Sequence, residues 1–519
     1  MTSARPRRQA VLWARLFELP EQPALPLQAR LRLAVVQAIL DGRLGAAAAL
    51  PSSRELALLL GLSRNTVTSA YQQLMDEGFL EARPRSGVFV AANARPPMAA
   101  ASEAQGRPRG APGRSPGHSP QWSRRVLRSL VDRPTLAKPD QWRDYPYPFV
   151  YGTHDPQLFP TEDFRECCAR SLARSQLPHW TPDLETDDVP ELIEQIRTRL
   201  LPRRGVFALR EEIIVTVGAQ HAYYLLADAL FDATQRLGLE EPGHPHARNS
   251  FAMRNPQVIE VAVDGEGLLV DALPALDYLF VTPSHQSPTT ATLSLERRQQ
   301  LLRSAESSDF VIIEDDYEAE NLYEGTPMPA LKSLDKSGRV IYVGSVSKSL
   351  SPALRLGYIV APRALVSELR AIRHAMVRHP SAFLQHAYAL FLSLGHHESH
   401  ARRVNQAMQE RLALAAQALR RHLPEFAFAL PQGGASIWVR APAWVDAAEL
   451  ALMAQSHGVL IEAGDVFFNK PPYPCPYFRL RLSSIATAQI DAGLCALGLA
   501  VDALAHARGV LRQPPQRAH

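Results

Sequence analysis

Lysine, cysteine and long apolar stretches are all scarce in this sequence. Only five of the 56 Lys and Arg residues are lysines, and of the four cysteines two are adjacent, at Cys167 and Cys168. This spacing matches no metal site and no disulfide framework, so we expect free thiols in a reducing compartment. No apolar run reaches the ~18 residues of a membrane helix, and the N-terminus is a poor signal peptide. We therefore expect a cytoplasmic protein that does not span a membrane.

Charge is distributed unevenly, although the formal net charge is only +4. Residues 1–90 hold 11 basic and seven acidic residues, and residues 91–140 hold nine basic and three acidic ones. The remainder holds 36 basic and 42 acidic residues. A basic end attached to an acidic bulk indicates that a polyanion would bind near the N-terminus.

Composition divides the chain into three parts. Residues 1–93 alternate helical periodicity with turn signals, and residues 94–140 form a linker rich in Pro, Gly and Arg that cannot bury a core. Residues 141–519 alternate short β-branched runs with helical patterns, which is typical of a parallel α/β sheet. Residues 193–205 predict an amphipathic helix whose basic end is exposed to solvent. The expected strands are Ile213–Val217, Tyr278–Thr282, Phe310–Glu314 and Val340–Gly344.

Two short helices joined by a tight turn are predicted in the first part. Ser52 or Ser53 can cap the first helix, and Gly61 provides the turn. Ser63 can cap the second helix, which runs over residues 64–77. An earlier helix is expected over 31–40. The pair forms a helix-turn-helix.

The second of these helices carries side chains suited to reading DNA. It opens with Arg64, Asn65 and Thr66, and such a first turn enters the major groove, where Arg can pair with guanine and Asn with adenine. Two strands within residues 79–90 then form a β-wing with Arg85 at its basic tip, suited to phosphate or minor-groove contact. The alternative is a helical protein-interaction module.

The motifs Leu-Pro-Ser-Ser-Arg-Glu-Leu-Ala, Gly-Leu-Ser-Arg-Asn-Thr-Val and Gly-Phe-Leu resemble the GntR-type winged helix. The resemblance implies double-stranded operator DNA as a partner. It places DNA contacts at Arg54, Arg64, Asn65, Thr66 and the wing residue Gly87, and the cap and the basic wing tip add Ser63 and Arg85.

Lys348 lies in an unusual setting for a chain so poor in lysine. It follows a predicted strand and stands among small hydroxyl residues, in Gly-Ser-Val-Ser-Lys-Ser-Leu-Ser-Pro. An amine, unlike a guanidinium, can condense with an aldehyde, so the position favours Schiff-base chemistry. Ser345, Ser347 and Arg355 would supply hydroxyls and a forked cation for a phosphate. A surface lysine on a loop is the alternative.

The predicted strand that ends in Glu-Asp-Asp-Tyr supplies what pyridoxal 5′-phosphate (PLP) needs, a carboxylate against its pyridinium nitrogen. Asp315 fits that role, and Tyr317 could donate a hydrogen bond to the phenolic oxygen of the ring. A solvated acidic loop is the alternative. Gly218, Ala219 and Gln220 follow another strand and open a helix, whose first amides are a natural phosphate cradle.

Together, Asp-Asp-Tyr, Ser-Lys-Ser-Leu-Ser-Pro-Ala-Leu-Arg-Leu-Gly-Tyr and Val-Thr-Pro-Ser-His-Gln resemble the MocR/GabR family. These are GntR regulators that carry a fold-type I, aminotransferase-like α/β domain with a smaller C-terminal α+β subdomain. The resemblance implies PLP as cofactor, an internal aldimine on Lys348, a small amino compound as effector, and a homodimer with exchanged DNA-binding domains. It also implies that Arg479 receives an effector carboxylate.

Several positions depart from the family pattern. His244 stands where the family usually has a tyrosine that would stack on the cofactor ring, and Arg481 stands where it usually has glycine. Ser287 and Thr290 alter the strip beside the ring. His285, in Pro-Ser-His-Gln, is expected either in the wall of the cofactor pocket or in a structural role.

The sequence therefore predicts a PLP-dependent transcription regulator whose conformation changes when an amino compound displaces Lys348. Two alternatives remain at this point. One is an active aminotransferase with an appended DNA-binding domain, and the other is a plain repressor whose C-terminal domain binds no cofactor.

Overall fold

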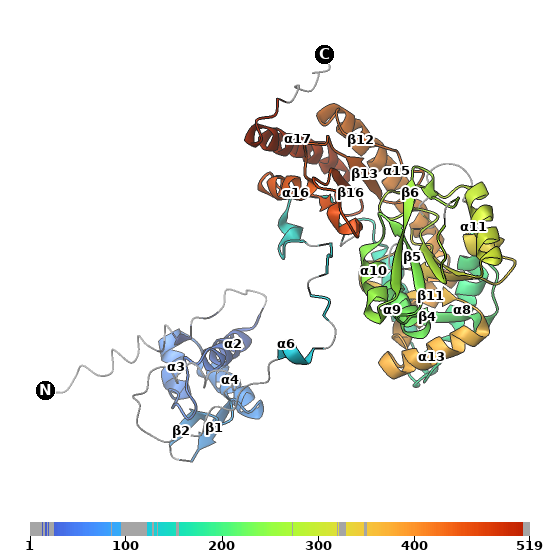
Figure 1. The fold of residues 1–519 in the computed structure, drawn as a ribbon. Helices are drawn as coiled ribbons and strands as arrows, with labels where there is room; N and C mark the ends of the chain where they lie inside the picture. Colours follow the sequence, from blue (N-terminus) through green and yellow to red (C-terminus); the bar gives the residue numbers. More distant parts are fainter. Residues whose placement is uncertain are drawn as a thin grey trace. The chain divides into compact units, whose positions relative to one another are not determined.

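The computed structural model of the chain describes residues 13, 16–17, 19, 25–84, 86–94, 122–126, 129–131, 133–136, 138–151, 155–271, 273–318, 320, 328–346 and 350–511. The chain forms two compact units, Met1–Gln121 and Trp122–His519 (Figure 1).

The N-terminal unit is a winged helix-turn-helix. Its described helices are α2 (Leu27–Leu40), α3 (Ser53–Leu60) and α4 (Arg64–Asp76), and β1 (Leu80–Arg83) pairs antiparallel with β2 (Gly87–Val90). Ser52 caps α3, because its hydroxyl accepts a hydrogen bond of 3.2 Å from the amide of Glu55. Ser63 caps α4 in the same way, accepting the amide of Thr66 at 3.1 Å. Gly61 adopts a φ of 63° in the turn between the two helices. The buried side chains pack into one core, which includes Leu31, Val35, Ile39, Leu56, Val67 and Leu74.

The C-terminal unit contains an eight-stranded sheet of order β4-β11-β10-β9-β8-β5-β6-β7. All four predicted strands are present. The expectation of a parallel sheet is correct for the pairs among β5, β6, β8, β9 and β10. It is wrong for β11, which runs antiparallel between β4 and β10, and for β7, which runs antiparallel to β6 at the edge. The connection from β10 to β11 spans only residues 346–356, shorter than a parallel crossover usually needs. The strands are β4 (Ile213–Thr216), β5 (Arg236–Glu241), β6 (Gln257–Asp264), β7 (Gly267–Leu268), β8 (Tyr278–Val281), β9 (Val311–Asp315), β10 (Val340–Ser345) and β11 (Gly357–Val360).

Helices cover both faces of this sheet, as Figure 1 shows around β5, β4 and β11. Alternate strand residues point to opposite faces, so Ile214 and Ile313 pack against one helical layer while Val215 and Ile312 pack against the other. The first layer consists of α9 (Gly218–Leu230), α10 (Pro245–Phe251) and α13 (Arg363–Val377). The second consists of α7 (Thr161–Ser171), α8 (Pro190–Gln195), α11 (Leu295–Ser307), α12 (Leu331–Leu334) and α14 (Ala382–Ser393).

A smaller antiparallel sheet of order β12-β13-β16-β15 forms a subdomain near the C-terminus. Its core also contains α17, part of the one described segment, Thr487–Ala507, that is long and apolar enough to cross a membrane. Leu494, Leu497 and Val501 of this helix are fully buried against the sheet, as expected of a core helix. The elements are α15 (His396–His422), β12 (Ala427–Phe428), β13 (Ser436–Arg440), α16 (Ala447–Ser456), β15 (Glu462–Ala463), β16 (Tyr477–Arg481) and α17 (Ile490–Ala507). The parallel pair β3 (Tyr147–Pro148) and β14 (Val459–Leu460) is separate from the four-stranded sheet but packs in the same core, and α6 (Trp122–Arg125) precedes these elements in the chain.

The segment after α8 corrects one prediction. It continues as a π-helical turn over Ile196–Leu200 and a 3-10 turn over Leu201–Arg204. Its basic end was expected to be solvated, and Arg203 is exposed as predicted. Arg204, in contrast, is only 7% exposed, and its Nε lies 2.7 Å from Oδ2 of Asp316. The carboxylate that makes this burial tolerable stands 112 residues further along the chain, so local periodicity could not reveal it.

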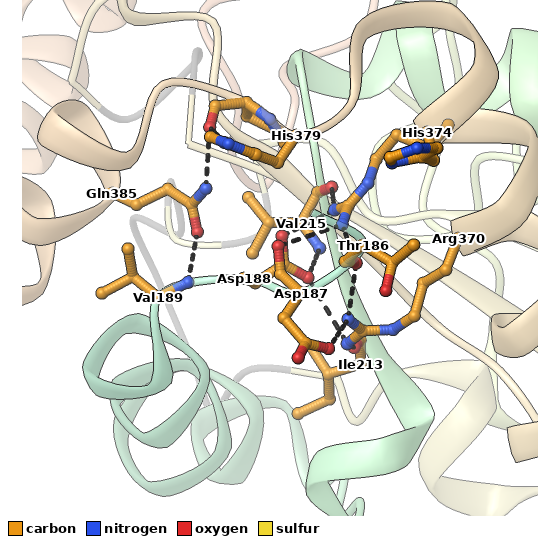
Figure 2. A network of polar contacts seen from close by, with 12 residues as sticks. Thr186, Asp187, Asp188, Val189, Ile213, Val215, Arg370, His374, His379 and Gln385 are labelled. Atoms are coloured by element: carbon orange, nitrogen blue, oxygen red, sulfur yellow. Dashed lines mark hydrogen bonds and ion pairs between the residues drawn. The ribbon is translucent and has the colours of Figure 1, made fainter. Parts of the chain in front are cut away.

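Side chains satisfy the outer edge of β4, the strand at the end of the large sheet. Asp188 accepts the amide of Val215 at 3.2 Å, and Arg373 donates to the carbonyl of Val215 at 2.6 Å. Arg370 donates to the carbonyl of Ile213 at 2.9 Å. Figure 2 shows Asp188 and Arg370 beside Val215 and Ile213 of this strand. They pair backbone groups that a sheet edge leaves open, and they fix the strand that leads into the site described below.

Candidate functional site

Seven residues predicted to hold a cofactor line one cavity of about 320 Å³ in the C-terminal unit. The cavity lies where β9 and β10 end beside the first turns of α9 and α10. Its volume lies in the range of small-molecule sites. The predicted residues are Ala219, Gln220, His244, Asp315, Tyr317, Ser345 and Arg355, and the other lining residues are Tyr151, Tyr223 and His246.

Asp315 is the buried carboxylate of this cavity. It is 1% exposed, and its Oδ2 accepts a hydrogen bond of 2.5 Å from the hydroxyl of Tyr223. Burial, and then the charge of Asp315, raise the pKa of Tyr223 well above its ordinary value. The phenol therefore stays protonated and remains the donor, which orients the carboxylate.

Only the middle one of three consecutive acids lines the cavity. Glu314 accepts the amides of Leu331 and Lys332 at 2.7 and 2.8 Å, and burial, with the charge of Asp316, raises its pKa to about 7. Asp316 pairs with Arg204, whose charge holds the pKa of Asp316 below its usual range in spite of burial. Glu314 and Asp316 are thus structural.

Two further groups line the cavity near Asp315. Tyr317 is buried, and burial, followed by the charge of Glu318, raises its pKa, so the phenol is a proton donor. The ring of His244 lies 6.4 Å from that of Tyr317, and its Nδ1 accepts the amide of Ala247 at 3.3 Å as the cap of α10. A neutral His244 therefore carries its proton on Nε2.

The first turn of α9 and Arg355 form the cationic end of the cavity. Gly218 has a φ of +72°, and a Cβ added there would lie 3.2 Å from the guanidinium carbon of Arg355. Arg355 itself has a φ of 52° and donates from Nη2 to the carbonyl of Val217 at 3.0 Å. The guanidinium and the positive end of the helix dipole thus meet beside Ala219 and Gln220.

Some predicted residues lie elsewhere. His285 is buried, but it is not among the lining residues; a methyl group added at Gly434 would lie 3.7 Å from its Cγ. Burial lowers the pKa of His285, so the ring is neutral there. Lys348 and Ser347 lie outside the described residues, as does Arg85 of the wing.

Arg479, predicted to receive an effector carboxylate, already has an internal partner. Its Nε lies 2.6 Å from Oε2 of Glu462, and both side chains are buried. Arg481 stands two residues later on β16 and is paired with Glu318. Tyr151 links the two pairs to the cavity, since its amide donates to Glu462 at 2.7 Å and its ring centre lies 5.7 Å from the Arg481 guanidinium carbon.

The predicted DNA-reading residues cluster on the N-terminal unit. Arg54, Ser63, Arg64 and Asn65 are exposed at the starts of α3 and α4. Thr66 is half-buried, and its hydroxyl lies 2.8 Å from Oγ of Ser63. In the wing, Gly87 is exposed with a φ of +110°, a conformation that favours glycine.

Comparison with known proteins assigns a family to each unit. Residues 27–90 match bacterial regulatory proteins of the gntR family, and residues 181–497 match aminotransferase class I and II. The HTH-type transcriptional regulator TauR of Rhodobacter capsulatus is 41% identical over 92% of this chain and 96% of that protein. The "Probable rhizopine catabolism regulatory protein MocR" of Rhizobium meliloti is 33% identical over 79% of this chain and 80% of that protein. The chain belongs to the MocR-type family of GntR regulators.

Both units of this MocR-type chain match the predicted fold class. The crystal structure of LysN, an alpha-aminoadipate aminotransferase from Thermus thermophilus, has a TM-score of 0.65 and is 27% identical, covering 71% of this chain and 95% of that one. The C-terminal unit therefore has the aminotransferase fold, and the N-terminal unit is a GntR DNA-binding domain of a transcriptional regulator.

Sequence reasoning on this MocR-type chain missed Tyr151, Tyr223, Glu318 and Glu462. Tyr223 occupies the buried face of α9, where an aromatic side chain is indistinguishable from ordinary core. Tyr151 and Glu462 belong to no motif. Glu318 directly follows the Asp-Asp-Tyr motif, so its position was a usable signal.

Proposed function

We propose that this chain is a transcription regulator that binds PLP through Lys348 and responds to an amino compound in the same cavity. The observation that carries the proposal is that Asp315, Tyr317 and Arg355 line one cavity of about 320 Å³. A carboxylate, a phenol and a guanidinium around one space suit a ligand that bears a protonated ring nitrogen, a phenolic oxygen and a phosphate.

The residues present fit this cofactor. Asp315 would hold the pyridinium nitrogen protonated, and Tyr317 would donate to the phenolic oxygen. The phosphate would lie at the start of α9 beside Arg355, where a side chain at position 218 would intrude. The sequence adds Ser347 to this end. The proposed phosphate contacts are Gly218, Ala219, Gln220, Ser345, Ser347 and Arg355, and His244 would lie beside the ring.

The protein's own side chains would bind the cofactor and orient it in the cavity. Tyr223 holds Asp315 in place, and the Tyr317 hydroxyl keeps its proton for donation. When bound, PLP supplies an aldehyde carbon for which the amine of Lys348 and that of an effector compete. A difference in contacts between these two states is what biases the conformation of the chain.

The N-terminal unit would bind operator DNA through Arg54, Ser63, Arg64, Asn65 and Thr66, with Arg85 and Gly87 from the wing. We propose a cytoplasmic homodimer with exchanged DNA-binding domains, because two winged helices then read two half-sites. The exposed first turn of α4 supports this use of the surface.

The test compares Lys348→Ala with Lys336→Ala, which changes an exposed lysine. Each purified variant is titrated with PLP, its visible absorption is recorded, and binding to DNA from upstream of its own gene is measured by footprinting with and without amines. We expect Lys348→Ala to lose the absorption and the amine response while keeping DNA binding, and Lys336→Ala to keep all three. A Lys348→Ala protein that keeps the absorption would overturn the proposal, and sustained turnover of amino donors with keto acceptors would identify an aminotransferase instead.

A further inference from the structure

We infer that Glu318 is an internal substitute for the carboxylate of the effector, and that an amino acid must displace it from Arg481 to bind. The inference rests on the proposed function, since it names the class of effector that the same site selects. It concerns a residue that follows Tyr317 directly but belongs to a different part of the site.

The carboxylate of Glu318 lies in a complete carboxylate-binding site. One oxygen pairs with the Arg481 guanidinium, and the other accepts the amide of Ala435 at 3.1 Å. Arg481 is held in turn by the hydroxyl of Ser436 at 3.0 Å. Gly434 makes room, because a Cβ there would lie 3.1 Å from Oε2 of Glu318. Any carboxylate of similar reach can use the same donors.

This site adjoins the cofactor cavity. The Arg481 guanidinium carbon lies 5.7 Å from the ring centre of Tyr151, which lines the cavity. A short amino acid whose amine reached the cofactor could therefore direct its carboxylate toward Arg481.

The second buried pair, Arg479–Glu462, is not suited to this exchange. The two residues are direct cross-strand partners on β16 and β15, so one small sheet holds both of them. The Arg481–Glu318 pair instead joins that sheet to the segment after β9 of the large sheet, 163 residues away in sequence. Opening it would disconnect two parts of the C-terminal unit, as a switch requires.

Charge favours displacement over simple addition. Arg479, Arg481, Glu318 and Glu462 carry two positive and two negative charges, and each side chain is 8% exposed or less. A further buried carboxylate would be uncompensated unless Glu318 left.

The experiment measures, by calorimetry on the PLP-loaded full chain, the affinities of β-alanine and of propylamine, which lacks the carboxylate. Glu318→Gln removes the competing charge but retains an acceptor for the amide of Ala435. We expect it to raise β-alanine affinity about tenfold or more and to leave propylamine affinity unchanged, because the binding-competent fraction rises only for the acid. Arg481→Met should make the two affinities similar.

Three further variants make the result decisive. Glu318→Asp shortens the side chain by one methylene, which withdraws the carboxylate from Arg481. It should change the affinities in the same direction as Glu318→Gln and replaces that variant if Glu318→Gln fails to fold. Glu449→Gln breaks a surface pair with Arg508 and serves as the matched control. Glu462→Gln tests the other arginine. The inference would be overturned if the Glu318 variants changed the affinities for β-alanine and propylamine equally, or if Glu462→Gln raised the affinity for β-alanine alone. A wild-type chain that does not bind PLP would instead refute the proposed function.

Discussion

Tyr223 donates a hydrogen bond of 2.5 Å to Asp315, and both side chains are fully buried. The donor belongs to α9, the helix that begins at Gly218. One helix therefore orients the carboxylate at one end of the cavity and forms the cationic end with its first turn. A shift of α9 would change both ends together.

Tyr223→Phe should lower both stability and PLP affinity while leaving the aromatic ring packed in place. The variant leaves Asp315 without this donor, so we expect a loss of about 1–3 kcal/mol in the free energy of unfolding and weaker PLP binding. Denaturant unfolding and PLP titration measure the two effects. Tyr224→Phe, on the next position of the same helix, is the control. Unchanged PLP affinity in Tyr223→Phe would mean that the hydrogen bond does not orient the carboxylate.

Gly218→Ala should impair phosphate binding. The added methyl group meets the Arg355 guanidinium at 3.2 Å, and the φ of +72° costs a residue with a Cβ about 1–2 kcal/mol. We expect lower affinity for PLP and for inorganic phosphate in titrations of the purified chain. Gly265→Ala, where nothing lies within 4 Å of the added Cβ, should behave like the wild type. Equal affinity in both variants would place the phosphate elsewhere.

Glu240 should make folding stability depend on pH. Burial raises its pKa from 4.5 to about 7, against hydrogen bonds from Thr282 and Gln286 that lower it. The folded state then keeps a proton that the unfolded state releases, so stability falls as pH rises from about 4.5 to about 7 and is level above. The effect is ~3 kcal/mol at most.

Unfolding by denaturant at a series of pH values checks this dependence. In Glu240→Gln the fall in stability over that interval should shrink relative to the wild type. The exposed Glu306→Gln should leave it as it is. A Glu240→Gln protein with the wild-type slope would show that the carboxyl titrates normally.

Arg64→Ala and Ser63→Ala should distinguish the contribution of a residue to DNA binding from its contribution to stability. Arg64 is exposed, so its loss should weaken operator binding and reduce its salt dependence while Tm stays constant. Ser63 caps α4 through the amide of Thr66, so its loss should also lower stability by ~1 kcal/mol. Gel-shift titration at several salt concentrations and thermal melting give both readouts. If Arg64→Ala bound as tightly as the wild type, the first turn of α4 would not be the reading surface.

Local patterns predicted the winged helix and four strands of the large sheet, because caps, turns and apolar runs are encoded within a few residues. Ser63 is such a case, since the residue that it caps is three positions away. Long-range pairings were not predictable. Arg204 looked like a solvated residue at the end of a helix because its partner Asp316 is far away in sequence.

The cavity was predicted in part for the same reason. Asp315, Tyr317 and Arg355 belong to recognisable motifs, whereas Tyr151 and Tyr223 enter the site only through the packing of distant elements. Arg479 was predicted from its motif, but its burial against Glu462 depends on the register of two strands.

In the segment Glu314–Glu318, each of the five successive side chains has different surroundings. Because each of these side chains meets a different partner, one inserted or deleted residue would move every side chain beyond it away from its partner. Natural variation in this segment should therefore proceed by substitution at constant length, and relatives that differ in length here should have lost the whole set together. The surroundings are the amides of α12 for Glu314, Tyr223 for Asp315, Arg204 for Asp316, the cavity for Tyr317 and Arg481 for Glu318.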